Sequence, residues 1–209
     1  MVLFMRKVCS FLLVFFIMGL AVPLFAQEED EEETPVIEWD SYIPDLYRAG
    51  DKVFTMTAGI VFPTIFTGEG MKGAKNSNLK LGGTGLLSFS YFLAPSWFIG
   101  GELQGSFIPT GGKNMLFIVP VGFYVGYQFV IGRFEIPVRI MTGIAPQRYM
   151  EKGYFGLIIK PGASVFYRLN ADWSFGLNFQ WWMLPQWPKN EKNVLGNFME
   201  ISFSARYHF

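Results

Sequence analysis

From residue 53 to the C-terminal Phe209, apolar side chains alternate with small or polar ones in eight successive segments. A period of two places these two kinds of side chain on opposite faces of a β-strand. The segments are residues 53–63, 79–92, 97–108, 115–129, 133–144, 154–169, 173–184 and 197–209. Their apolar rows are rich in aromatic and β-branched residues, which favour strands. The pattern therefore predicts eight strands, each with one strongly apolar face.

One stretch, residues 115–132, carries no charge and is long enough to be a membrane-spanning helix. It also contains Pro120 and three glycines, and its apolar residues recur with a period of two, which favours a strand. Apolar strands can span a membrane only as a closed barrel, because lipid satisfies no unpaired backbone edge. We therefore expect an all-β fold, an eight-stranded antiparallel up-and-down transmembrane β-barrel that comprises residues 52–209.

The predicted connections between strands alternate in length. Those near residues 93, 130 and 170 are tight, whereas the long connections are residues 63–78, 109–114, 145–153 and 185–196. Outer-membrane barrels have short periplasmic turns and longer outer loops, and an even number of strands leaves both chain ends on one side. We therefore expect the protein in the outer membrane of a diderm bacterium, with its N- and C-termini in the periplasm.

The N-terminal residues have the pattern of a secretory signal peptide. Arg6 and Lys7 precede an apolar stretch, residues 11–22, and Ala26 is a small residue at the expected cleavage site. We expect residues 1–26 to be a cleaved signal peptide; the alternative is an uncleaved anchor helix. The only cysteine, Cys9, would be removed with it, so the mature protein would have no disulfide.

Residues 27–51 are expected to form a periplasmic segment that is first acidic and then aromatic. Residues 28–33 are six consecutive acidic residues, which is typical of a disordered run. We expect the second half of the segment to fold under the mouth of the barrel, near Arg133, Arg168 and Arg206.

The last strand ends in alternating apolar residues and a C-terminal phenylalanine, with Phe203, Tyr207 and Phe209 in the apolar row. This pattern resembles the signal by which the barrel-assembly machinery recognises outer-membrane proteins, although Ser204 stands where a glycine is usual. Residues 52–209 resemble the eight-stranded OmpW/OmpX/OmpA-type barrels in size and in loop asymmetry. The resemblance implies an outer-membrane location, contact with outer-membrane lipids and, in some members, passage of small hydrophobic compounds or adhesion.

The inward rows of the predicted strands bring polar and charged residues to one depth in the lumen. This predicted polar cluster comprises Glu102, Gln104, Arg139, Lys160, Asn178, Gln180 and Glu200. Charges in such a place are tolerated only when they are paired, so we expect a plug of ion pairs. The alternative is a gate or an ion path, because rings of charge can select ions.

Nearer the outer side the inward row becomes apolar. Its residues are Leu116, Ile118, Met141, Ile158, Trp182 and Phe198. They form a candidate chamber for an apolar ligand; the alternative is that they pack against each other or against a loop. We therefore predict a narrow or closed channel that binds or passes small hydrophobic compounds.

The predicted outer loops are basic and suggest a second function. Their charged residues are Lys72, Lys75, Lys113, Arg148, Lys152, Lys189 and Lys192, against Glu69, Glu151 and Glu191. A basic rim attracts anionic surfaces, so the alternative is a structural or adhesion protein without transport, which binds an anionic extracellular surface. Such residues can also simply keep the loops soluble.

Enzymatic chemistry is not expected. His208 is the only histidine, and it is predicted to point into the lumen away from every loop serine. The glycines in residues 82–85 lie within a predicted strand and do not form a phosphate-binding loop. We therefore expect no catalytic residue, no metal, no cofactor and no nucleic-acid partner.

Overall fold

A computed structural model of the protein describes residues 47–68, 71–72, 78–112, 114–150, 152–186 and 194–209. The strands are β1 (Lys52–Gly68), β2 (Met71–Lys72), β3 (Gly82–Ala94), β4 (Trp97–Pro109), β5 (Met115–Ile118), β6 (Val121–Ile131), β7 (Phe134–Tyr149), β8 (Lys152–Arg168), β9 (Trp173–Gln186) and β10 (Val194–His208). Within these residues no helix is long and apolar enough to span a membrane. The predicted signal peptide, residues 1–26, lies outside the described residues, as do residues 27–46.

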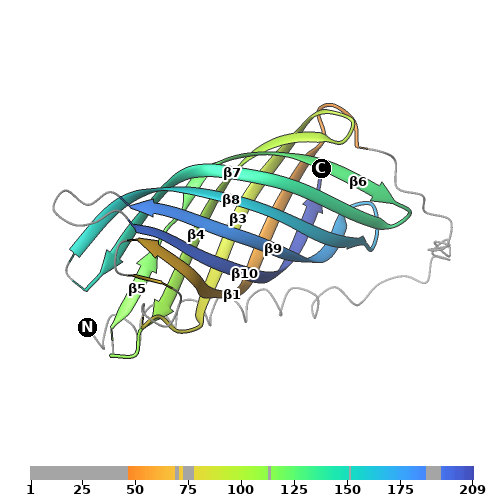
Figure 1. Ribbon diagram of the computed structural model, residues 1–209. Coiled ribbons are helices and arrows are strands. Elements are labelled where there is room, and N and C mark those ends of the chain that lie inside the picture. Colours follow the sequence, from red (N-terminus) through yellow and green to blue (C-terminus); the bar gives the residue numbers. More distant parts are fainter. Residues whose placement is uncertain (1–46, 69–70, 73–77, 113, 151, 187–193) are drawn as a thin grey trace, which may run out of the picture. The chain divides into compact units, whose positions relative to one another are not determined.

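The strands form one closed antiparallel sheet (Figure 1). The order around the wall is β1, β3, β4, β6, β7, β8, β9 and β10, and β10 pairs back onto β1. β5 and β6 share one position in the wall, because each pairs with both β4 and β7. β2 only extends the end of β1. The prediction of an all-β, eight-stranded, closed antiparallel barrel is confirmed.

The break between β5 and β6 falls at Val119 and Pro120, where proline removes a backbone donor. The wall stays hydrogen-bonded there. The amide of Val119 donates to the carbonyl of Pro146, and the amide of Gln104 donates to the carbonyl of Pro120, both at 2.9 Å. The predicted strand over residues 115–129 is therefore one barrel strand with a local interruption.

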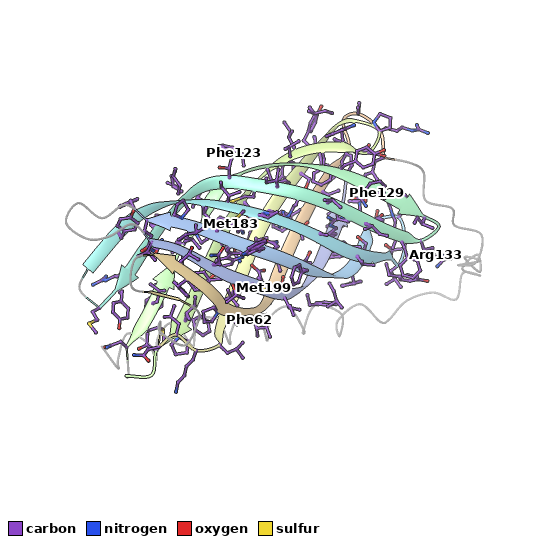
Figure 2. The ribbon with its side chains drawn as sticks, in the orientation of Figure 1. Phe62, Phe123, Phe129, Arg133, Met183 and Met199 are labelled. Carbon is purple, nitrogen blue, oxygen red and sulfur yellow. The ribbon has the colours of Figure 1, made fainter. Side chains whose placement is uncertain are left out.

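Side chains alternate between the two faces of the wall, as predicted. On β9, Phe175, Leu177 and Phe179 are exposed on the outer face, whereas Ser174 and Asn178 are buried in the lumen. Figure 2 shows the outward side chains pointing away from the wall, with Phe123 and Phe129 among those labelled. The outer face of the wall is consequently apolar over most of its surface, and its side chains are exposed.

One end of the barrel carries three tight connections, residues 95–96, 132–133 and 169–172, together with the described chain ends at Tyr47 and Phe209. We call it the turn end, and the opposite end the loop end. Aromatic side chains contact each other around the turn end in the pairs Trp97–Tyr127, Tyr127–Phe129, Phe134–Tyr167, Trp173–Tyr207 and Tyr207–Phe209. They correspond to the aromatic belt that strands carry where a membrane meets water.

The prediction of a long loop over residues 145–153 is wrong. β7 and β8 remain paired as far as Tyr149 and Lys152, so residues 150–151 alone connect them. The polar residues Gln147 and Arg148 suggested a loop, yet they continue the alternation, with Gln147 buried in the lumen and Arg148 exposed.

The loops predicted over residues 63–78 and 185–196 are also too long. β1 continues past Pro63 to Gly68 after a register shift between Pro63 and Phe66, and β10 already begins at Val194. A shift of this kind bends a strand and interrupts its alternation, which is why the sequence pattern ended too early. The barrel therefore extends further at the loop end than predicted.

Candidate functional site in the lumen

Glycines on β6 and β7 make room for the long side chains that cross the lumen. Glu102 of β4 lies opposite Gly122 of β6, which in turn pairs with Gly143 of β7. A Cβ atom at Gly122 would come within 2.7 Å of the Cε of Met141. The absence of a side chain at Gly122 therefore leaves space for that of Met141.

Five of the residues predicted for the polar cluster form a connected group, which we call the central network: Glu102, Gln104, Arg139, Lys160 and Glu200. The Oε2 of Glu102 lies 3.1 Å from the Nη2 of Arg139, and its Oε1 pairs with the Nζ of Lys160. Lys160 also donates to the Oε1 of Gln104, whose Nε2 donates to the Oε2 of Glu200 at 2.7 Å. The contacts thus run without a break from β7 to β10 across the lumen.

The central network balances its own charge. Two carboxylates face two cations, and Glu102, Lys160 and Glu200 are each at most 4% exposed. Glu200 also accepts hydrogen bonds from the Nε1 of Trp182 at 3.0 Å and from the hydroxyl of Ser202 at 2.8 Å. Burial of a charge is tolerated when it is paired or well hydrogen-bonded; Glu102 pairs with both cations, and Glu200 accepts three hydrogen bonds from neutral donors.

Asn178 and Gln180 do not join the central network through any described ion pair or side-chain hydrogen bond. The Nδ2 of Asn178 donates to the hydroxyl of Ser204 at 2.7 Å, one row nearer the turn end, and also lies 3.4 Å from the hydroxyl of Ser202, which donates to Glu200. Gln180 is 2% exposed, and its Oε1 has no hydrogen-bond partner among the described residues. The predicted cluster of seven is therefore a network of five with two flanking amides.

On the loop-end side of the central network lies an apolar layer. Five of the six residues predicted as a ligand chamber are buried in one packed cluster, and Leu116 packs against it: Ile118, Met141, Ile158, Trp182 and Phe198. The ring of Phe198 contacts the rings of Phe66 and Trp182, with centroid distances of 5.4 Å and 6.3 Å. These side chains are buried and pack against each other at this level of the lumen.

A second polar group lies at the turn end, and no prediction placed it as a site. We call Glu135, Arg168, Ser174, Arg206 and His208 the turn-end network. Glu135 pairs with Arg168 at 3.1 Å and with Arg206 at 3.7 Å, and the hydroxyl of Ser174 lies 2.9 Å from the Nε2 of His208. The alternation had already placed these residues in the inward row. All five residues lie within three positions of a tight connection or of Phe209, and this shared place in their strands was the signal that they meet.

Tyr47, which precedes β1, packs against side chains at the turn end. Its ring stacks on Phe92 with a centroid distance of 4.1 Å, its hydroxyl lies 3.4 Å from the Nδ1 of His208, and the guanidinium of Arg168 lies 5.6 Å from its ring centre. Burial raises the pKa of the Tyr47 phenol well above its usual value, and the carboxylate of Glu135 adds to the shift. The phenol of Tyr47 is therefore uncharged at neutral pH.

The hydroxyl of Ser174 lies between His208 and Glu135, with its oxygen 3.5 Å from the Oε2 of Glu135. Ser174 and His208 are both buried, and the other ring nitrogen of His208 faces the hydroxyl of Tyr47 and not a carboxylate that would orient it. The described part of the chain also contains no group of three or more His, Cys, Asp or Glu side chains that could hold a metal ion.

Comparisons with known proteins agree with the barrel. A family model matches residues 18–207. An uncharacterized protein of Treponema pallidum (strain Nichols) is 32% identical over 131 residues, covering 62% of this chain and 60% of that protein. An uncharacterized protein of Borreliella burgdorferi (strain ATCC 35210 / DSM 4680 / CIP 102532 / B31) is 27% identical over 151 residues, covering 62% of this chain and 70% of its own. The match thus spans less than two thirds of the Treponema pallidum relative.

Among solved structures, the chain is similar to the crystal structure of Neisserial surface protein A. The TM-score is 0.59 at 10% sequence identity, and the match covers 77% of this chain and 97% of that one. At this identity the likeness shows a shared fold. The eight-stranded barrel is therefore supported by the pairing of the strands and by a solved structure.

Proposed function

The chain belongs to the family whose model matches residues 18–207, and from its fold we infer that it is an integral outer-membrane barrel with a sealed lumen. Closed antiparallel barrels with an even number of strands and an apolar outer face are the form in which β-structure crosses outer membranes. The exposed apolar rows and the aromatic contacts at the turn end support this location. The tight turns and both chain ends would then lie in the periplasm.

The central network carries the proposal of a sealed lumen. Its members come from β4, β7, β8 and β10, so side chains from opposite parts of the wall meet in the middle. An ion that entered would have to replace the ion pairs of Glu102 and the hydrogen bonds of Glu200, which are buried. Small eight-stranded barrels have an interior that side chains can fill, which supports a closed state.

Two measurements test location and closure together. Membrane fractionation of cells that express the full chain should place the protein in the outer membrane. In proteoliposomes, the purified protein should not increase the rate of swelling in isotonic solutions of small sugars. Recovery from the inner membrane or the soluble fraction would contradict the location, and rapid swelling would contradict a sealed lumen.

A second candidate function is the binding or passage of small hydrophobic compounds in the apolar layer. The observation in its favour is that Trp182, Phe198 and Met141 belong to one buried apolar cluster. The indole of Trp182 donates a hydrogen bond to Glu200 of the central network, which borders this cluster. A ligand would have to displace packed side chains, so binding should change the fluorescence of Trp182. Titration with a medium-chain fatty acid tests this, and a Trp182→Phe variant identifies the signal from that residue. Trp182-dependent fluorescence that stays constant up to ligand saturation of the micelles would count against it.

Adhesion through the basic loops remains the alternative function. Arg148 is exposed at the loop end, as this function requires. The predicted loop residues Lys75, Lys113, Lys189 and Lys192 lie outside the described residues, as do Glu69, Glu151 and Glu191, and the side chains of Lys72 and Lys152 are not described. Binding of whole cells to heparin-coated and uncharged surfaces would separate this function from a purely internal one.

A further inference from the structure

The turn-end network has more positive than negative charge. The guanidinium groups of Arg168 and Arg206 share a single carboxylate, Glu135, at distances of 3.1 Å and 3.7 Å. In contrast to the balanced central network, one positive charge is left over in a nearly enclosed space. Charge that is removed from water attracts a counter-ion more strongly than exposed charge does.

Two buried N–H donors, one on Arg206 and one on Gln128, lack an acceptor. Among the described residues, neither the Nε of Arg206 nor the Nε2 of Gln128 has a hydrogen-bond partner. Both side chains line the same small void, together with Val53, Ser90, Phe92 and Phe98. A buried donor without an acceptor is unfavourable, so two of them at one void point to an acceptor that binds there.

Tyr47 packs against the residues that surround this void. Its ring covers Phe92, which lines the void, and its hydroxyl reaches His208, which pairs with Val53 across the β1–β10 seam. The void is too small to hold a water molecule, so an anion could enter only if side chains beside it moved. Removal of Tyr47 would free Phe92 and His208 to move without breaking a strand pair, because Tyr47 precedes β1.

Tyr47 is held at the turn end by weak contacts, which would allow it to leave. Its long hydrogen bond and ring contacts are weak compared with the ion pairs of the central network. The chain behind it turns at Gly50, which has a φ of 103° and whose amide donates to the carbonyl of Phe92 at 2.8 Å. This φ favours glycine, and the glycine therefore allows the sharp turn that brings Tyr47 over the mouth.

We propose that the turn end of the lumen is a binding site for a small anion and that Tyr47 is its removable stopper. When Tyr47 leaves, Arg206 and Gln128 can donate to the anion, and the excess positive charge of Arg168 and Arg206 holds it. The inference concerns the turn end alone and does not depend on whether the central network is sealed.

Cysteine labelling tests both parts of the proposal. Val53→Cys, in a chain that also carries Cys9→Ser, places one thiol in the void. The folded protein in micelles is treated with two methanethiosulfonate reagents of similar size, one with a sulfonate group and one with a trimethylammonium group. With Tyr47 present, both reactions should be slow. Each rate is first divided by the rate at which the same reagent reacts with a free thiol in solution. With Tyr47→Ala, the anionic reagent should then react about tenfold or more faster than the cationic one.

Two matched variants separate the site from general charge. In the Tyr47→Ala background, Arg206→Gln should abolish the preference for the anionic reagent. Arg133→Gln removes the same charge from a half-buried turn residue at the same end and should leave the preference intact (Figure 2). Inorganic phosphate at constant ionic strength should slow the anionic reagent in Tyr47→Ala and have no effect once Arg206 is replaced.

Several outcomes would overturn the proposal. Fast labelling of Val53→Cys with Tyr47 present would show that Tyr47 is no stopper, and equal rates for the two reagents in Tyr47→Ala would show that the site is not selective for anions. Tyr47→Phe keeps the ring and should stay closed, which covers the case that the alanine variant does not fold. A thiol at Ile118→Cys, beyond the central network, should remain unreactive throughout; its labelling would contradict the sealed lumen and leave the claim about Tyr47 standing.

Discussion

The indole Nε1 of Trp182 donates a hydrogen bond of 3.0 Å to the Oε2 of Glu200. This contact joins the apolar layer to the central network, and the Nζ of Lys160 lies 5.2 Å from the centre of the same indole ring. Trp182 therefore belongs to both layers, with its ring among apolar neighbours and its one donor on a buried carboxylate.

Substitution of Trp182 should separate these two contributions. Trp182→Phe keeps most of the ring but removes the donor to a charged acceptor, so the free energy of unfolding should fall by about 2 kcal/mol. Trp182→Ala also leaves a cavity, and the loss should be about 3–5 kcal/mol. Urea unfolding in detergent micelles, followed by loss of the folded band on unheated gels, measures both. No loss in Trp182→Phe would contradict the role of the hydrogen bond, and equal losses for the two variants would contradict the contribution of packing.

Removal of the central carboxylate should be severe. Glu102→Gln leaves the buried charges of Arg139 and Lys160 without their shared partner, and the expected loss in unfolding free energy is about 3–5 kcal/mol. In the double variant Glu102→Gln with Arg139→Gln, the loss should be smaller than the sum of the two single losses, because the two residues interact. Additive losses, measured by the same urea unfolding, would mean that the pair does not interact.

The glycines of the wall should not be equivalent. A Cβ at Gly143 would collide with the backbone of Val121 and Gly122, whereas a Cβ at Gly105 would meet nothing within 4 Å. Gly143→Ala should therefore destabilise the barrel by about 1–3 kcal/mol. Gly105→Ala, on the outer face, should change the free energy of unfolding by less than about 0.5 kcal/mol. Unfolding of both variants at the same urea concentration would contradict a close backbone approach at Gly143.

Much of the barrel could be predicted because alternation depends only on the strand period. The facing of residues such as Glu102 and Phe175 follows from that period alone, and the structure has both as predicted. The loop-end extensions were missed because a register shift after Pro63 and the polar pair at Gln147 and Arg148 disturbed the pattern. Local irregularity, and not tertiary packing, explains these errors.

The contents of the lumen were harder to predict. Strands in a barrel are tilted, so residues at equal counts along their strands differ in depth, and Asn178 consequently meets Ser204 and not Glu102. The expectation that residues before the barrel fold under its mouth holds for Tyr47, which contacts Arg168. No pattern in the sequence indicates which aromatic residue of that segment enters the lumen, because insertion depends on the turn at Gly50.

The C-terminal residue should matter for assembly more than for stability. Phe209 is 66% exposed, on the outer face, as expected for a residue read by another protein. Phe209→Ala should lower the amount of folded protein in cells, yet refolding from urea into micelles should change its stability by less than about 0.5 kcal/mol. Leu169→Ala removes an exposed apolar side chain from the same end and should leave cellular assembly intact. Unchanged cellular levels in Phe209→Ala would argue against an assembly signal formed by Phe203, Tyr207 and Phe209.

Single-channel recording in planar bilayers tests the sealed lumen most directly. The side chains of the central network contact one another from β7 to β10 across the lumen, so the wild-type protein, once its insertion is verified, should give no steady conductance above the bare membrane. Glu102→Gln should show intermittent openings, because Arg139 and Lys160 would no longer be held across the lumen. A steady, large conductance of the wild-type protein would contradict a barrel closed by its own side chains.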